Sequence, residues 1–331
     1  AAYRGDWSEA VERLRGLWLG LDTNKVYHTD FRHVSMRVLH WGLRLLSGGR
    51  FGRGDVRGMV DTSPLEHFLR THLIEQDGRV VGIDENLQEA VIDAVAIITT
   101  NYASGRSEAW VQSVNEDLWQ KGQLTSNSAA LTVPHVLASA ALPMFFPAIS
   151  LGGQWHGDGG IRLSAPLSPA MHLGAERILA VSPRAADGAH THSGTEPYPS
   201  PAQIAGVLLN SVFLDLLDFD ALQMQRINEL LEQIAPAQWG GFRPVEVMVL
   251  RPQEDLGELA RAHELGLPKA FRFFGQGLEN KREPSADALS MVMFEPEYLS
   301  LLMTLGEQDT AARSEEIRDF LLAPRKGDSH D

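Results

Sequence analysis

Cysteine is absent from the 331-residue chain, which excludes disulfides, thiolate nucleophiles and cysteine-based zinc sites. Basic residues are also scarce, since 29 Lys and Arg stand against 43 Asp and Glu, for a formal net charge of −14. This balance argues against broad nucleic-acid binding, which needs a basic surface. No apolar run approaches the ~20 residues of a membrane-spanning helix. The remaining composition, 44% hydrophobic and 22% charged, is typical of a globular protein with one large domain or two ordinary ones.

Helix and strand patterns alternate in the first half of the chain. Apolar residues at helical spacing predict helices, and short apolar runs between turn residues predict buried strands. The expected helices cover 6–21, 64–76, 134–141 and 166–173, and the expected strands cover 94–100, 109–114, a stretch around 149, and 177–182. This order favours an α/β fold with a mostly parallel central sheet, although the first two strands are predicted to form a hairpin.

The second half begins with a segment rich in Gly, Ser, Thr, Pro and His, which predicts a linker or long loop. Helices are then expected over 201–234, 291–305 and 314–322, with one strand over 245–250 and a polar tail from 324. We therefore divide the chain into residues 1–185, the linker 186–202, and a mainly helical C-terminal region, 203–331, packed on the core. The sequence contains no internal repeat.

A basic segment interrupts the otherwise acidic chain. Residues 25–57 hold seven basic and two acidic side chains, a net charge of +5, and residues 31–54 hold no acid. Apolar side chains recur among the arginines at helical spacing, at Val34, Val38, Trp41 and Leu45. One interpretation is a surface helix with a buried stripe and a solvated basic face. The other is an interfacial helix whose apolar residues enter lipid while the arginines meet anionic headgroups.

The densest chemical signal is the run Gly157-Asp158-Gly159-Gly160, which follows a predicted strand. Three glycines around one carboxylate allow a sharp turn and the close approach of another group. An Asp at the end of a sheet strand is well placed to act as a base at the crevice of an α/β fold. The simpler interpretation of these four residues is a tight turn, because Asp-Gly is a common turn dipeptide.

Other signals for metals and cofactors are weak. His156 could form a metal pair with Asp158, but no further ligand spacing supports it, and a histidine of a turn or the surface is the simpler interpretation. His190 and His192 lie in the polar linker and are interpreted as solvated. The sequence lacks the dinucleotide, P-loop and H-E-x-x-H motifs, and also the G-x-S-x-G nucleophile motif. We therefore expect no cofactor and no metal.

Several segments, in their order and spacing, resemble the patatin-like phospholipase family of lipid acyl hydrolases. The stretch 138–143, continued by Phe146-Pro147, resembles the small-residue helix and Pro-Phe-Pro turn of the family. About ten residues on, the run 157–160 matches its Asp-Gly-Gly/Ala motif. Further segments that fit the family lie at 5–21, 61–65, 99–107, 166–170 and 177–181. The resemblance covers residues 1–185, and 200–322 resemble the helical C-terminal extension of some bacterial members.

The resemblance implies a patatin-like layered α/β fold, with a mostly parallel central sheet flanked by helices and a helical C-terminal extension. It also implies a Ser–Asp dyad in which Asp158 is the general base and Gly157, Gly159 and Gly160 support its motif. The serine would attack the carbonyl of a phospholipid or other acyl ester and form an acyl-enzyme that water cleaves. Because a free Asp has a pKa near ~3.9, we expect burial beside Phe145-Phe146 to raise it.

The sequence departs from the family pattern at the nucleophile. The family's G-x-S-x-G motif and its upstream Gly-rich oxyanion loop are absent, and Ala1-Ala2-Tyr3 match the far end of the nucleophile's helix. We expect that the chain is truncated, with a naturally non-catalytic relative as the alternative. In either case the 331-residue chain alone is expected to be inactive.

Three functions are therefore compared. The first is part of a serine lipid acyl hydrolase, and the second is a non-catalytic patatin-like protein that binds membranes or partners. The third is an unrelated α/β enzyme in which Asp158 binds a metal. In the first two, residues 31–54 would make a peripheral membrane contact. The expected location is the cytoplasm or the membrane periphery, and a lost N-terminus would also leave room for a signal.

Overall fold

The computed structural model describes residues 2–28, 58–115, 118–121, 124–185, 204, 207–208, 211, 215–263 and 289–323. The basic segment 31–54, the predicted linker 186–202 and the tail from 324 lie outside these residues. Within them, no helix is both long and apolar enough to cross a membrane.

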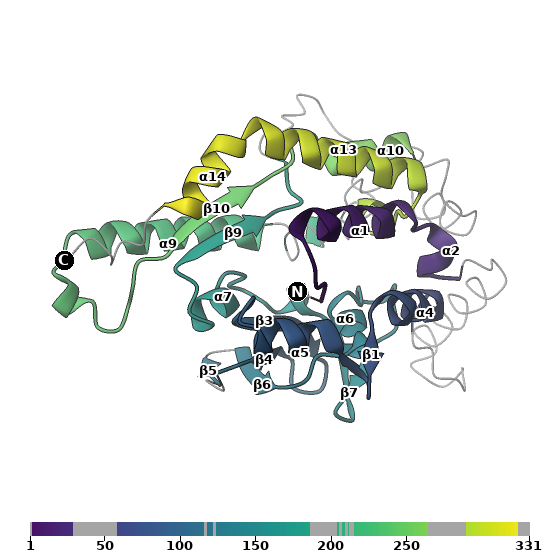
Figure 1. Cartoon of the computed structure of the whole chain (residues 1–331), viewed down its shortest axis with the longest axis horizontal. Coiled ribbons are helices and arrows are strands. Elements are labelled where there is room, and N and C mark those ends of the chain that lie inside the picture. The colour runs from purple at the N-terminus through teal and green to yellow at the C-terminus, as the bar shows by residue number, and fades with distance from the viewer. Residues whose placement is uncertain are drawn as a thin grey trace.

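A six-stranded sheet forms the lower layer of the molecule in Figure 1. Its strands run in the order β5 (Gln120–Lys121), β6 (Leu124–Ser128), β4 (Arg106–Ser113), β3 (Ala94–Asn101), β8 (Gln154–Asp158) and β7 (Ile149–Leu151). Only β4 and β6 are parallel, and the other four junctions are antiparallel. The prediction of a mostly parallel sheet is therefore wrong for the described strands, while the α/β class and the patatin-like layering are confirmed.

Short turns explain the antiparallel junctions. Strands β7 and β8 are joined by Gly152 and Gly153 alone, both with positive φ values of 57° and 82°. Such a two-residue glycine turn returns the chain beside itself, so the two strands must be antiparallel. The predicted hairpin at 94–114 is confirmed as β3 and β4, whose eight residues each pair in full register.

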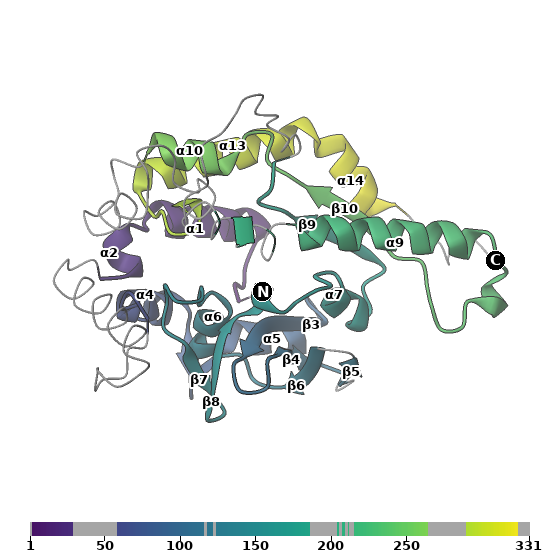
Figure 2. The same cartoon turned by 180° about the vertical axis from the view of Figure 1, so that it is seen from behind.

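Four helices gather around this sheet in both Figure 1 and Figure 2: α4 (Ser63–His72), α5 (Val81–Gln88), α6 (Val133–Ser139) and α7 (Ser168–His172). Helix α6 contacts β3, β7 and β8, and so covers the region where β8 ends. Helix α5 contributes Ile83 and Leu87 to an apolar cluster against Val95 and Ile97 of β3. A separate hairpin is formed by β1 (Glu75–Gln76) and β2 (Arg79–Val80).

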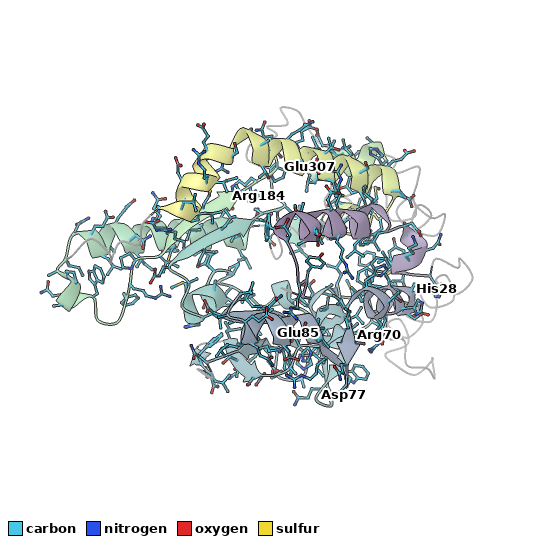
Figure 3. All side chains as sticks on the ribbon, viewed as in Figure 1. His28, Arg70, Asp77, Glu85, Arg184 and Glu307 are labelled. Carbon is cyan, nitrogen blue, oxygen red and sulfur yellow. The ribbon has the colours of Figure 1, made fainter. Side chains whose placement is uncertain are left out.

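The upper layer joins the N-terminal helices to the C-terminal region (Figure 1). It contains α1 (Trp7–Leu19), α2 (Thr23–Val26), α9 (Leu216–Glu232), α10 (Leu256–Ala262), α13 (Pro296–Ala312), α14 (Ser314–Leu322) and the parallel pair β9 (Arg177–Val181) and β10 (Glu246–Leu250). Helix α1 lies along α13, where Arg15 pairs with Glu307 at 2.8 Å (Figure 3). The domain boundaries at 185 and 203 stay predictions.

The apolar face of α1 does not lie in the core. The helix itself is confirmed, but Trp7 is 81% and Leu14 is 56% exposed, and Val11 and Trp18 are exposed as well. Leu21, which follows the helix and continues this helical spacing, is buried. An exposed apolar face of this kind is typical of an interaction surface.

Candidate active site

Asp158 is the last residue of β8, and hydrogen bonds fix its backbone on both sides. Its N–H donates to the carbonyl of Ala141, just after α6, at 3.0 Å. Its carbonyl accepts a hydrogen bond of 2.7 Å from the hydroxyl of Thr100 on β3. In the β3–β8 register Asp158 lies opposite Thr99. The position of Asp158 is therefore set jointly by two strands and one helix.

The side chain of Asp158 closes the turn that follows. Its Oδ1 accepts a hydrogen bond of 2.8 Å from the N–H of Gly160, at the start of the 3₁₀ turn Gly159–Ile161. The tight-turn interpretation is thus correct for the backbone. It does not account for the carboxylate, which also lines a groove.

Two glycines of the motif are required by close contacts. A Cβ atom on Gly159 would lie 2.4 Å from the carbonyl oxygen of Ile98, and one on Gly157 would lie 2.1 Å from the hydroxyl of Tyr102. Strand β3 and the residue after it therefore press directly against the main chain on either side of Asp158. This is the close approach that the glycine-rich pattern predicts.

A groove of about 520 Å³ opens beside Asp158. It is lined by Ala96, Ile97 and Ile98 of β3, Val136, Ser139 and Ala140 of α6 and its end, and Asp158, Gly159, Gly160 and Leu163. Of these described lining residues, Ser139 alone carries a hydroxyl. The groove combines one carboxylate with mostly apolar walls, as a site for an apolar substrate with a reacting polar group does.

Burial raises the pKa of Asp158 to about 6, while the N–H of Gly160 acts in the opposite direction. The direction agrees with the sequence-based expectation, but the surroundings differ. The walls that desolvate the carboxylate come from β3 and α6, whereas Phe146 packs with Tyr27 in another cluster. A carboxylate with a pKa near neutral can both accept and return a proton at physiological pH.

His156 is a core residue, so its interpretation as a turn or surface histidine is wrong. Its side chain is 1% exposed, and its Nδ1 lies 3.0 Å from the hydroxyl of Thr99. The sequence did not indicate this burial, because glycine turns flank the strand that carries His156. Within the described part of the chain, no three His, Asp or Glu side chains gather as they would around a metal. His190 and His192 lie outside the described residues.

Four further residues surround Asp158 that the sequence did not indicate: Thr99, Thr100, Tyr102 and Ser139. The pKa of Tyr102 is raised, first by burial and then by the negative charge of Asp158, so its phenol stays protonated at neutral pH. These contacts arise from the pairing of β3 with β8, some 57 residues apart, which no local spacing encodes. The one available signal is the change from an apolar run to the polar run Thr99-Thr100-Asn101 at the end of β3.

Comparison with known proteins gives one match. The sequence model of a family described as patatin-like phospholipase matches residues 4–171, just over half of the chain. The matched range includes the six-stranded sheet, α6 and Asp158. Searches of curated proteins and of solved structures gave no match.

Proposed function

Since the chain belongs to the patatin-like phospholipase family, we propose that it is the carboxylate-bearing part of a serine lipid acyl hydrolase. The family acts in general on ester bonds of lipids, and its fold is the one described above. The finer proposal is that Asp158 is the general base of a Ser–Asp dyad. The observation that carries it is a half-buried carboxylate, with a pKa near 6, at the wall of an apolar groove.

In the proposed reaction the ester carbonyl lies in the groove beside Asp158. The carboxylate takes the proton of a serine hydroxyl as the serine oxygen attacks the carbonyl carbon. When the tetrahedral intermediate collapses, Asp158 returns this proton to the leaving alcohol and the acyl-enzyme remains. Water then attacks the acyl-enzyme and gives a proton to Asp158. As the fatty acid leaves, Asp158 passes this proton to the serine oxygen, which restores the free serine and the carboxylate.

We propose that the serine comes from a segment that packs against β3 and α1. Ala2 lies in the same apolar cluster as Val95 and Ile97, and the carbonyl of Tyr3 accepts a hydrogen bond of 2.9 Å from Asn86 of α5. The beginning of the chain therefore lies beside the strand that forms one wall of the groove (Figures 1 and 2). A segment joined there would lie next to β3, the strand that also forms one wall of the groove beside Asp158.

The test is to express the chain with residues from its own reading frame that precede Ala1 and supply a G-x-S-x-G motif. Hydrolysis of a p-nitrophenyl ester and of phospholipid vesicles is measured, and a fluorophosphonate probe labels the reactive serine. We expect activity in the extended protein, none in the 331-residue chain, and loss of activity in Asp158→Asn.

Asp77→Asn is the matched control. Asp77 lies in the turn between β1 and β2 at the outer edge of the lower layer (Figure 3), and its φ of 53° suits Asn as well as Asp. This variant should keep full activity. Activity of the 331-residue chain that survives Asp158→Asn but not Ser139→Ala would instead assign the chemistry to the groove hydroxyl and refute the dyad.

The alternative is a patatin-like protein without catalysis that binds membranes or partners. It becomes the account to prefer if the extended protein binds vesicles but neither hydrolyses esters nor reacts with the fluorophosphonate. For both functions we propose peripheral membrane contact through residues 31–54, which lie outside the described residues.

A further inference from the structure

Two buried histidines meet on one indole beneath the candidate active site. The ring of Trp110 on β4 lies 4.9 Å from the ring of His135 on α6 and 5.6 Å from that of His156 on β8, both in edge-on geometry. Both histidines are buried. The indole N–H of Trp110 donates to the hydroxyl of Thr99 at 2.8 Å, and that hydroxyl contacts Nδ1 of His156. One cluster therefore connects β3, β4, β8 and α6.

One hydrogen bond of this cluster requires an unprotonated ring nitrogen. Nδ1 of His135 accepts from the main-chain N–H of Thr132 at 3.2 Å, and it also lies 2.7 Å from the Thr132 hydroxyl; the hydrogen bond from the N–H forms only while Nδ1 carries no proton, because a main-chain N–H can only donate. The same ring forms the capping box at the start of α6. For His156, the Thr99 hydroxyl accepts the proton of Trp110 and lies 3.0 Å from Nδ1; it can donate its own proton to a neutral ring or accept one from a protonated ring.

Burial favours the same neutral state. It lowers the pKa of both histidines, and for His135 the neighbouring His156 lowers it further. The charged groups near the pair are Glu108 on β4, whose charge raises the pKa of His156, and Asp158 at the end of β8. Glu108 is already held by the amides of Asn101 at 2.7 Å and Asn127 at 3.1 Å.

The cluster holds the elements that fix Asp158. His156 is two residues before Asp158 on the same face of β8, and Thr99 lies opposite Asp158 on β3. The helix that His135 caps ends beside Ala141, whose carbonyl accepts the N–H of Asp158. Loss of the cluster would release both the strand and the helix end that set the carboxylate.

We propose that His156 and His135 are positioning residues for Asp158, and that they hold it through Thr99 and Trp110 only while both rings are neutral. Protonation of the rings removes the hydrogen bond from the Thr132 N–H and places two like charges beside one buried indole. The end of β8 then separates from α6, and water reaches Asp158. This proposal rests on the proposed function for the role of Asp158, but not for its readout.

The test follows the pKa of Asp158 in the full 331-residue chain by carboxyl ¹³C NMR, with the signal assigned by its loss in Asp158→Asn. In His156→Leu we expect this pKa to fall by about 1 unit, because entering water weakens the effect of burial. His156→Asn keeps an acceptor at the position of Nδ1 and should retain the raised pKa. His67→Asn, at an exposed histidine of α4, should change nothing.

A second readout is the indole N–H signal of Trp110, assigned with Trp110→Phe. In the Asp158→Asn background it should shift with a midpoint below the usual His value of about 6.5, and this shift should vanish in His135→Asn with His156→Asn. A folded His156→Leu with an unchanged pKa of Asp158 would overturn the proposal. If that variant does not fold, Trp110→Phe takes its place with the same expectation. Because neither readout needs hydrolysis, an extended protein that shows no hydrolysis would refute the dyad without changing this result.

Discussion

The hydroxyl of Thr100 donates a 2.7 Å hydrogen bond to the main-chain carbonyl of Asp158, so β3 holds the proposed base through a side chain as well as through the strand ladder. Replacing Thr100 by Val leaves this half-buried carbonyl without its donor. We expect Thr100→Val to lower the free energy of unfolding by about 1–2 kcal/mol in urea denaturation. Thr100→Ser keeps the hydroxyl and should lose less; equal losses in both variants would mean that the hydrogen bond contributes nothing.

The two glycines beside Asp158 should respond differently to the same added methyl group. In Gly159→Ala the Cβ meets the main-chain carbonyl of Ile98 at 2.4 Å, and the β3 backbone cannot move without breaking its pairing with β4. We expect a loss of about 1–3 kcal/mol, as for overpacked sites. In Gly157→Ala the obstacle is the hydroxyl end of the half-exposed Tyr102, which can rotate away.

Thermal unfolding of both glycine variants checks this contrast. Gly157→Ala should lower the stability less than Gly159→Ala does. Combining Gly157→Ala with Tyr102→Ala should remove most of the remaining loss of stability. If Gly157→Ala is the more damaging of the two, the contact with Ile98 is not what requires glycine in this motif.

The raised pKa of Asp158 makes the stability of the fold depend on pH. The folded state holds this proton up to a pH of about 6, whereas the unfolded chain releases it near 3.8, so folding binds protons between these values. Stability that is present below pH 3.8 is therefore lost as pH rises through 6. At 1.36 kcal/mol per pKa unit, the contribution of Asp158 to the free energy of unfolding is at most about 3 kcal/mol. We expect about 1–2 kcal/mol, because the group is partly exposed.

Asp158→Asn removes this dependence, because the amide keeps the acceptor for Gly160 but does not ionise. Its free energy of unfolding should exceed that of the unsubstituted protein at pH 8 by about 1–2 kcal/mol and equal it near pH 3.5. Guanidinium denaturation at four pH values measures the difference, with Asp77→Asn as a flat control. A constant difference across the range would show that the pKa of Asp158 is not raised.

The sequence predicted local features well because these depend on neighbouring residues. The strand 94–100 is observed as Ala94–Asn101, and the helix 314–322 is observed at the same residues. The helix predicted over 291–305 begins instead at Pro296, since proline is favoured in the first turn and the residue before it avoids helical geometry.

Features that depend on distant contacts were not predicted. The groove beside Asp158, the burial of His156 and the hydrogen bond from Thr100 all follow from the pairing of β3 with β8. Helical spacing places Leu14 and Trp18 on one face of the N-terminal helix, and both are exposed. Periodicity identifies an apolar face but does not say whether another element covers it.

The last prediction concerns the basic segment 31–54, whose structure is not described. An acid-free, Arg-rich stretch in a protein of net charge −14 should bind anionic lipid by charge. Sedimentation with phosphatidylglycerol vesicles should therefore show binding at 0.01 M salt that is largely lost at ~1 M, where the screening length falls to ~3 Å. Arg37→Glu with Arg44→Glu should abolish binding at low salt.

A charge-matched pair separates the effect of this segment from that of net charge. Arg226 and Arg318 are exposed on α9 and α14, so Arg226→Glu with Arg318→Glu changes the net charge equally while leaving residues 31–54 intact. This pair should retain most of the binding. If both pairs reduce binding alike, the vesicles sense the charge of the whole protein, and if neither does, or salt has no effect, the interfacial-helix interpretation is wrong and a solvated surface helix remains.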